Sequence, residues 1–324
     1  MEAACEARPA HGTSHPMLTR ADIETAATRL HGHVRRTPVM DIQAGEFGLP
    51  YPVMLKLELL QHAGSFKPRG AFNRMLAADL PQAGVIAASG GNHGAAVAYA
   101  AQRLRVPAEI FVPELTPEAK RARIASYGAT LVCTGASYAE ALEASRARQR
   151  ETGALEIHAY DHNDVLAGQG TVGRELQAQA PEVSHVLVSV GGGGLIGGIA
   201  GWYAGAVEVI AVEPRLCPSL HRALEAGAPQ PAPVGGVAAD SLGARQVGDL
   251  MFDVARRHVR RSVLVEDDAI RAAQRALWDR LRLVVEPGGA TAFAALHSGA
   301  WTPPSAARVA VIVCGANADP GTVL

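Results

Sequence analysis

Short apolar runs alternate with longer, capped segments along most of the chain. Runs of about four to eight apolar residues bounded by Gly, Pro or polar clusters are typical of buried strands, and longer segments with capping residues are typical of helices. The runs that predict strands are residues 53–60, 85–88, 109–112, 130–134, 186–190, 209–212 and 309–313. The segments that predict helices are residues 19–30, 68–78, 95–104, 117–127, 138–152, 196–205, 266–281 and 291–297. This alternation predicts an α/β fold with mostly parallel sheets.

The predicted elements form one compact α/β unit at about residues 80–155 and a second unit after it. A chain of 324 residues is long enough for two domains, each with its own core. Residues 1–17 mix Pro, His, Gly, Ser and Glu without periodicity, so we expect them to form a disordered leader.

Composition narrows the class of protein. Apolar residues make up 48% of the chain and aromatic residues only 5%, which suits a parallel α/β core of small aliphatic side chains. A net charge of −1 without a basic block argues against nucleic acid or an anionic membrane as the main partner and favours a small neutral or zwitterionic substrate. The four cysteines form no CxxC pair, so neither a disulfide framework nor a thiolate zinc site is indicated. Without a signal pattern or a membrane-spanning apolar run, we expect a soluble cytoplasmic protein.

Only three lysines occur in the chain, and they limit the amines available for chemistry. Arginine stays protonated, so an amine that forms an imine with a carbonyl must come from these lysines or the N-terminus. Lys67 lies in Gly-Ser-Phe-Lys-Pro-Arg-Gly near the start of a predicted helix, where the helix dipole disfavours a cation. Lys56 alternates with leucines, which predicts an outward-facing strand residue, and Lys120 is expected to be a solvated helix residue. Lys67 is therefore the candidate functional lysine.

Two glycine-rich turns, at residues 89–94 and 191–195, each connect a predicted strand to a predicted helix. Such a turn presents amide N–H groups and the positive end of a helix dipole to an anion. The second turn also matches the dinucleotide fingerprint, because a Gly-x-Gly-x-x-Gly motif begins at Gly192 and the acidic Glu213 follows at the end of the next strand. A glycine-rich turn that is required only for packing of the helix against the strand is a further, less favoured interpretation. A dehydrogenase, however, needs neither an amine at Lys67 nor a second anion-binding turn.

Five segments together make the pattern specific. They are Gly-Ser-Phe-Lys-Pro-Arg-Gly-Ala at 64–71, Ser-Gly-Gly-Asn-His-Gly at 89–94, Ala-Gly-Gln-Gly-Thr at 167–171, Gly-Gly-Gly-Gly-Leu at 191–195 and Glu-Pro-Gly-Gly-Ala at 286–290. In this order they closely resemble the motifs of the pyridoxal-phosphate-dependent threonine/serine dehydratase (threonine ammonia-lyase) and serine racemase family of fold type II. The likeness covers about residues 18–319.

The resemblance implies a fold similar to that of the tryptophan synthase β-subunit, with two domains that each contain a mostly parallel sheet flanked by helices. The small, mobile domain would comprise residues 80–155, and the large cofactor-binding domain residues 18–79 and 156–324. Pyridoxal 5′-phosphate would lie between them. The family also suggests a homodimer.

The resemblance also assigns roles to individual residues. The cofactor contacts that it implies are Lys67 as the Schiff-base lysine, Phe66 beside the cofactor, Asn92 at the pyridoxal hydroxyl, Gly191, Gly192, Gly193, Gly194 and Leu195 at the phosphate, and Cys314 at the pyridine nitrogen. The substrate contacts that it implies are Ser89, Gly90, Gly91, Asn92 and His93, by side chain or amide, together with Ser241. A phosphate and an amino-acid carboxylate need two separate anion sites, in agreement with the two turns.

The activity that this resemblance implies is β-elimination from L-threonine or L-serine, which yields 2-oxobutanoate or pyruvate and ammonia. Lys67 would remove the α-proton while the pyridine ring accepts the charge. Another elimination, a replacement or a racemisation of a β-substituted amino acid is the alternative within the family. A nicotinamide-dependent oxidoreductase is the alternative from a different class.

Four positions depart from the family pattern. Family racemases have a second Ser where this chain has Gly90, so we expect elimination rather than racemisation. Cys314 replaces a Ser or Thr. Ser241 replaces a Gly, so the identity of the substrate's side chain stays undecided. Relatives bind a cation through two acidic residues, one at the position of Glu213 and one at the position of Ser219. Because this chain has a serine at the second position, a metal site stays undecided. No regulatory domain is expected after the last motif.

Overall fold

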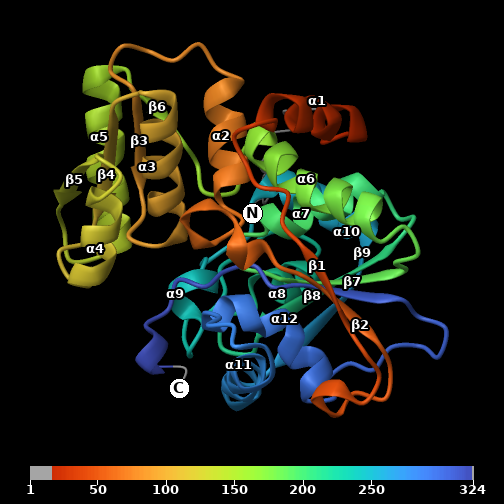
Figure 1. The fold of residues 1–324 in the computed structure, drawn as a ribbon. Coiled ribbons are helices and arrows are strands. Elements are labelled where there is room, and N and C mark those ends of the chain that lie inside the picture. Colours follow the sequence, from red (N-terminus) through yellow and green to blue (C-terminus); the bar gives the residue numbers. More distant parts are fainter. Residues whose placement is uncertain (1–16, 323–324) are drawn as a thin grey trace, which may run out of the picture.

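The computed structural model describes residues 17–322, and the predicted leader therefore lies almost wholly outside the described residues, as do His11, His15 and Cys5. Two sheets dominate the described chain (Figure 1). The larger one has the strand order β1-β2-β10-β7-β8-β9. Its strands are β1 (Val39–Ile42), β2 (Val53–Lys56), β7 (His185–Ser189), β8 (Glu208–Pro214), β9 (Val259–Val265) and β10 (Val309–Ile312). All neighbouring pairs are parallel except β1 with β2, which is antiparallel.

The smaller sheet is parallel throughout and has the strand order β5-β4-β3-β6. Its strands are β3 (Val85–Ala88), β4 (Ala108–Val112), β5 (Thr130–Cys133) and β6 (Leu155–Glu156). The helices of this unit are α3 (Asn92–Leu104), α4 (Glu118–Ala125) and α5 (Tyr138–Thr152). One core joins α3 and α4 to one face of the sheet, and a smaller core joins α5 to the other. Figure 1 shows this unit as the separate lobe on the left.

Helices also cover both faces of the larger sheet. They are α1 (Arg20–Leu30), α2 (Pro68–Leu76), α6 (Asn163–Gln179), α7 (Gly194–Tyr203), α8 (Ser219–Ala226), α9 (Ala239–Leu242), α10 (Asp249–His258), α11 (Asp267–Leu281) and α12 (Pro287–His297). One core contains residues of α1, α6, α7 and α10, and a second contains residues of α11 and α12 on the opposite face. Helix α2 packs against both α6 and α3 and so connects the two lobes (Figure 1).

Local sequence signals explain where several helices begin. Thr19 caps α1 and forms a capping box with Asp22, because the Thr19 hydroxyl accepts from the Asp22 amide while the Asp22 carboxylate accepts from the Thr19 amide. Ser137 caps α5 in the same way through the amide of Glu140. Two helices begin earlier than predicted, α3 at Asn92 and α12 at Pro287, so that the later residues of both glycine-containing motifs lie within a first helical turn.

Other elements were not predicted. The apolar run at 53–60 forms a strand only to Lys56 and continues as the 3₁₀ helix η2 (Glu58–Leu60). The long helix α6 was missed because its middle, Ala-Gly-Gln-Gly-Thr, contains poor helix formers. Its glycines at 168 and 170 permit close contact with neighbouring backbone, so packing overrides propensity there. Among residues 17–322, no helix is long and apolar enough to cross a membrane.

Candidate active site

The carboxyl ends of parallel strands from the larger sheet meet the smaller unit at one pocket. Strand β7 leads into the turn at 191–194, β10 leads to Cys314, and residues 66–67 follow β2 and its short 3₁₀ helices. Open α/β sheets bind ligands at this edge. The residues that line the pocket are Phe66, Lys67, Asn92, Tyr160, Ser189, Gly191, Gly192, Gly193, Gly194, Leu195, Ser241, Leu242, Glu286, Gly288 and Cys314. The structure therefore brings together every predicted cofactor contact, along with Ser241.

Lys67 lies at the start of α2, with Pro68 as the first helical residue. Proline suits this position because its fixed φ matches the helix and its missing N–H is not needed there. The Lys67 ammonium donates a hydrogen bond of 2.9 Å to the carbonyl of Ala159 and lies 5.2 Å from the centre of the Phe66 ring. Burial lowers the pKa of Lys67 to about 8. The amine is thus much closer to its neutral, nucleophilic form at neutral pH than an exposed lysine would be.

The glycine turn after β7 forms a cradle around the start of α7. Gly193 precedes this helix with a φ of 90°, a left-handed conformation that favours glycine. A side chain at Gly192 would overlap the ring of Tyr160, which covers this part of the cradle. The first amides of α7 have no side-chain cap at Gly193 and remain available to an anion. Sequence reasoning missed Tyr160, since no motif marks it.

The turn after β3 forms the second helix start. Gly91 precedes α3, and its amide donates to the Ser89 hydroxyl at 3.2 Å. The imidazole of His93 is buried and its Nε2 lies 2.7 Å from the carbonyl of Ile157, to which it donates. Burial lowers the pKa of His93 to about 3, so the ring is neutral. The His93 ring is therefore held by backbone, and only its amide remains for the predicted contact with a substrate.

A chain of side-chain hydrogen bonds that was not predicted crosses the pocket. The Asn92 amide donates 2.6 Å to the Glu286 carboxylate, and the Asn317 amide donates 2.6 Å to the Asn92 oxygen. Burial raises the pKa of Glu286 to about 7. Glu286 begins the recognised Glu-Pro-Gly-Gly-Ala motif, but the sequence did not indicate that its carboxylate would face Asn92.

Cys314 and Ser241 flank Gly288 from different elements. The Cys314 thiol lies 3.6 Å from the Gly288 carbonyl, and burial raises its pKa to about 12, so it stays neutral. A Cβ at Gly288 would overlap the Ser241 hydroxyl. Gly288 thus leaves the space that the Ser241 side chain occupies. Cys314 and Ser241, which both depart from the family pattern, lie in the pocket wall.

Glu213 has a structural environment of its own. Its carboxylate accepts from the amides of Leu220 at 2.7 Å and His221 at 2.8 Å, and from the Ser262 hydroxyl at 2.9 Å. The Glu213 carboxylate therefore accepts hydrogen bonds from the free amides in the first turn of α8 and does not face the glycine cradle. In the described part of the chain, no three His, Cys, Asp or Glu side chains are grouped to hold a metal ion.

One expectation for a lysine was wrong, and another was confirmed only in part. Lys56 is fully buried instead of facing outward, because its side chain reaches Glu175 and Gln179 of α6, each at 2.8 Å. Lys120 lies on a helix as predicted, but it is only partly solvated and forms an ion pair with Asp240. This pair joins α4 of the smaller unit to α9 of the larger.

Comparison with known proteins identifies the family of this site. Residues 30–315 match the family described as pyridoxal-phosphate dependent enzyme. The chain belongs to this family. Its cofactor is accordingly pyridoxal phosphate, its fold is type II, and the resemblance drawn from the five motifs is confirmed. The dinucleotide interpretation of the glycine turn is not supported.

Individual members of the family are similar over most of their length. The chain is 39% identical to the L-threonine ammonia-lyase of Geobacter sulfurreducens over 312 residues, which cover 95% of this chain and 77% of the relative. It is 39% identical to the phenylserine dehydratase of Ralstonia pickettii over 302 residues, 91% of each chain. The structure of maize serine racemase superposes with a TM-score of 0.88 at 35% identity, covering 94% of this chain and 95% of the other.

The residues present fit pyridoxal phosphate. The cradle at Gly192 has no room for a side chain, and the helix behind it presents uncapped amides that suit a phosphate. Lys67 provides an amine of lowered pKa in the same pocket.

Proposed function

We propose that this enzyme is an ammonia-lyase that eliminates water from L-threonine or L-serine to give an enamine, which then takes up water and releases ammonia to form 2-oxobutanoate or pyruvate. One observation carries the proposal: a lysine amine of lowered pKa lies in one pocket with an uncapped helix start and with Asn92, the residue that begins α3 after the second glycine turn. The names of the similar proteins support a β-hydroxy amino acid as the substrate class.

The proposed binding roles follow from the pocket wall. The amides of the cradle from Gly191 to Gly194, with Leu195, would hold the phosphate, and Lys67 would hold the cofactor covalently. Asn92 would contact the ring hydroxyl, because one of its N–H groups is already used by Glu286 and the other is left over. The amides of the turn that begins at Ser89 would hold the substrate carboxylate at the start of α3.

The chemistry of the chain's own groups is as follows. When bound, pyridoxal phosphate withdraws electron density from the α-carbon of an attached amino acid. With a pKa of about 8, roughly a tenth of the Lys67 amine is neutral at pH 7 and can accept the α-proton. Cys314 stays a neutral thiol, so it would act as a weak hydrogen-bond partner and not as a counter-ion to the ring nitrogen.

Gly90 supports elimination over racemisation. Racemisation needs a second proton-transfer group on the opposite face of the α-carbon, and glycine has none. The space that a side chain at Gly90 would take is limited by Thr116, whose methyl group would lie 2.8 Å from an added Cβ. The Thr116 hydroxyl would lie 3.1 Å from the same position.

The proposal has a direct test. The purified enzyme is supplied with L-threonine, L-serine, D-serine and phenylserine, and 2-oxo acid, ammonia and product chirality are measured. Borohydride reduction followed by peptide mass spectrometry locates the attached cofactor, which we expect at Lys67 in the wild type and nowhere in Lys67→Ala. Steady-state oxo-acid formation by Lys67→Ala, or no oxo acid from any of these substrates, would contradict the proposal.

We also propose that the unit at residues 80–155 is a mobile domain that closes over the pocket. Its contacts with the larger unit include the Lys120–Asp240 ion pair and a hydrogen bond from Arg123 to Asn317. The Lys120–Asp240 pair is exposed, and exposed ion pairs contribute little stability and can open readily. A homodimer in the cytoplasm is the remaining proposal, based on the family resemblance, and analytical ultracentrifugation tests the dimer.

A further inference from the structure

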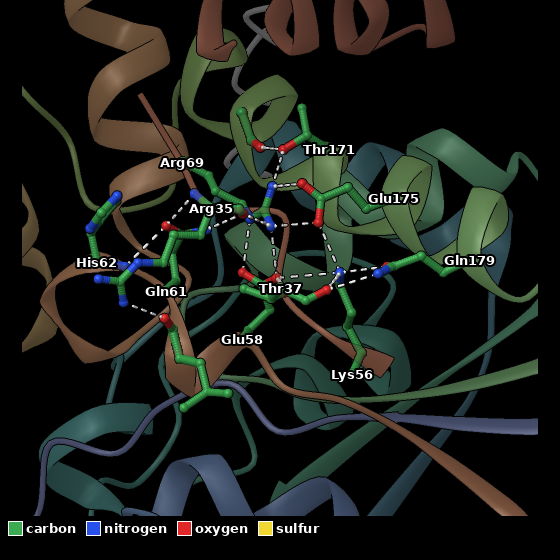
Figure 2. A network of polar contacts seen from close by, with 12 residues as sticks. Arg35, Thr37, Lys56, Glu58, Gln61, His62, Arg69, Thr171, Glu175 and Gln179 are labelled. Carbon is green, nitrogen blue, oxygen red and sulfur yellow. Dashed lines mark hydrogen bonds and ion pairs between the residues drawn. The ribbon is translucent and has the colours of Figure 1, made fainter. Parts of the chain in front are cut away.

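A buried ionic cluster contains Arg69, which follows Lys67 by two residues in the chain (Figure 2). Two cations, Lys56 and Arg69, alternate with two carboxylates, Glu58 and Glu175, so the four formal charges balance. The side chains of Lys56, Glu58 and Arg69 are fully buried, and that of Glu175 is 15% exposed. Buried ion pairs of this kind are weak evidence for stability, since apolar residues often serve as well. The hydrogen bonds of this cluster are directional, however, and can fix the positions of the segments that they join.

Arg69 is the most constrained member of the cluster. Its Nε and Nη2 atoms donate to the two oxygens of Glu58, each at 2.8 Å. Its Nη1 and Nη2 atoms donate to the two oxygens of Glu175 at 2.8 and 2.9 Å. Further bonds reach the Thr171 hydroxyl at 3.1 Å and the Arg35 carbonyl at 3.3 Å. All three guanidinium nitrogens are thus engaged, and two bidentate contacts fix the plane of the group.

The bonds of Arg69 connect three separate segments to the backbone that carries Lys67. Glu58 belongs to the 3₁₀ helix after β2, and Thr171 and Glu175 belong to α6. The third segment is the connection between α1 and β1, which contains Arg35. Figure 2 shows Arg69 between Glu58 and Glu175. Arg69 follows Lys67 by two residues in the first turn of α2.

This first turn is also pressed closely against α6. A side chain at Gly168 would overlap the Arg69 carbonyl oxygen, so the two backbones are in direct contact there. The Arg69 amide donates to the Phe66 carbonyl at 3.1 Å, and the Ala71 amide donates to the Lys67 carbonyl at 3.2 Å. A shift of the guanidinium would therefore move the Lys67 backbone as well.

We propose that Arg69 is a positioning residue, which sets the location of the Lys67 amine in the pocket by fixing the first turn of α2 against Glu58 and Glu175. This inference rests on the proposed function of Lys67. The Lys67 amine must hold the cofactor and then reach the α-proton. Both tasks require a fixed backbone position, because the lysine side chain is long and flexible. A displacement of about 1 Å at a reacting group lowers the rate by about a hundredfold in general.

Lys56 provides a matched control inside the same cluster. It is the other buried cation, and it also contacts Glu175, yet its bonds lead to Thr37 and Gln179 and not to the first turn of α2. Arg69→Met and Lys56→Met each remove one buried positive charge and keep an unbranched side chain. Both variants should lower Tm, because each leaves the two buried carboxylates with one cation in place of two.

Positioning predicts different effects on the cofactor and on turnover. The measurements are kcat, KM and the visible circular dichroism of the bound cofactor, which reports its orientation. In Arg69→Met we expect kcat to fall at least about tenfold, KM to change by less than about threefold, and the visible band to change in sign or lose about half its intensity. In Lys56→Met we expect kcat within about threefold of the wild type and an unchanged visible band. Equal losses in the two variants, or an unchanged band in Arg69→Met, would show that Arg69 is merely structural.

A milder pair of variants keeps the test decisive if either methionine variant fails to fold. Thr171→Val removes one bond to Arg69, and Gln179→Met removes one bond to Lys56. We expect a fall in kcat of about two- to threefold with a changed visible band only for Thr171→Val, and identical behaviour of the two variants would overturn the proposal. Borohydride reduction of the wild type separates this outcome from failure of the proposed function: no label at Lys67 rejects the function, whereas a label at Lys67 with identical variants rejects only the positioning role.

Discussion

Glu286 accepts a hydrogen bond of 2.6 Å from the side-chain amide of Asn92 inside the pocket. The bond connects the start of α12 in the larger unit to the start of α3 in the smaller one. Because the Glu286 carboxyl is buried, its charged form is disfavoured and its pKa is raised to about 7. The protonation state of a residue between the two lobes thus changes within the physiological pH range.

The pH dependence of kcat/KM should show the ionisation of the Glu286 carboxyl. We expect kcat/KM of the wild type to show an ionisation near pH 7 that is absent in Glu286→Gln, because glutamine cannot lose a proton. The raised pKa also means that folding takes up a proton between the unfolded value of about 4.5 and the folded value of about 7. This contribution to stability is therefore complete below pH 4.5 and is lost as the pH rises through 7.

Chemical unfolding at several pH values tests whether the contribution of Glu286 to stability is lost as the pH rises. The difference in free energy of unfolding between Glu286→Gln and the wild type should shift in favour of the variant as the pH rises from 5 to 8. Glu213, whose pKa burial also raises to about 7, is the matched control, since it lies outside the pocket lining. Glu213→Gln should show the same stability trend without removing the ionisation from kcat/KM. An unchanged kcat/KM profile in Glu286→Gln would contradict the prediction.

Gly192→Ala should impair cofactor binding. The added methyl group overlaps the ring of Tyr160, and overpacking of this kind costs about 1–3 kcal/mol, equivalent to an affinity for pyridoxal phosphate that is about 5- to 150-fold weaker. Fluorescence titration of the apoenzyme with the cofactor measures this. Gly235→Ala is the control, because the nearest atom to its added Cβ is 3.8 Å away. Equal affinities in the two variants would show that the cradle tolerates a side chain.

A serine at position 90 should introduce racemisation only if space is made for it. Gly90→Ser alone places a Cβ 2.8 Å from the Thr116 methyl group, so we expect lower elimination activity and little D-serine. The double variant Gly90→Ser/Thr116→Ala relieves this contact and should form D-serine from L-serine at a rate at least about tenfold above the single variant. Chiral chromatography measures both products. Absence of D-serine from the double variant would show that the missing hydroxyl is not what prevents racemisation.

The Lys120–Asp240 ion pair should affect the closing of the smaller unit more than its stability. The Asp240 side chain is 64% exposed, so the pair contributes little to the free energy of unfolding. In Lys120→Gln we expect KM to rise about two- to fivefold with Tm unchanged and a weaker dependence of KM on salt than in the wild type. The exposed pair of Arg256 with Asp253 is the control, and Arg256→Gln should leave KM unchanged.

Much of the fold and most of the pocket could be predicted from the chain. Strand β3 and helix α5 were predicted with the bounds that the structure has, because short apolar runs and a capped amphipathic segment are local signals. The glycine turn at 191–194 and Lys67 were identified from motifs whose chemistry depends on adjacent residues. Helix α6 was missed, since its glycines lower helix propensity and only contacts with α2 and α7 explain them.

The pairing of distant charges could not be predicted in the same way. Lys56 alternates with leucines and would face solvent on a half-exposed strand, but strands of a parallel sheet are covered on both faces. Its carboxylate partner Glu175 is 119 residues away. Likewise, Asn92 and Glu286 are 194 residues apart, and nothing local indicates that they touch.

By itself the sequence determined the class of fold, the family, the candidate lysine and the two glycine turns, because each depends on spacing within a few residues. Only the tertiary structure decided that Lys56 is buried, that the His93 ring faces a carbonyl, and that Arg69 joins the lysine segment to α6. The physical reason is that burial and charge pairing are properties of the packed chain: they depend on which segments meet, and that is settled by the whole core.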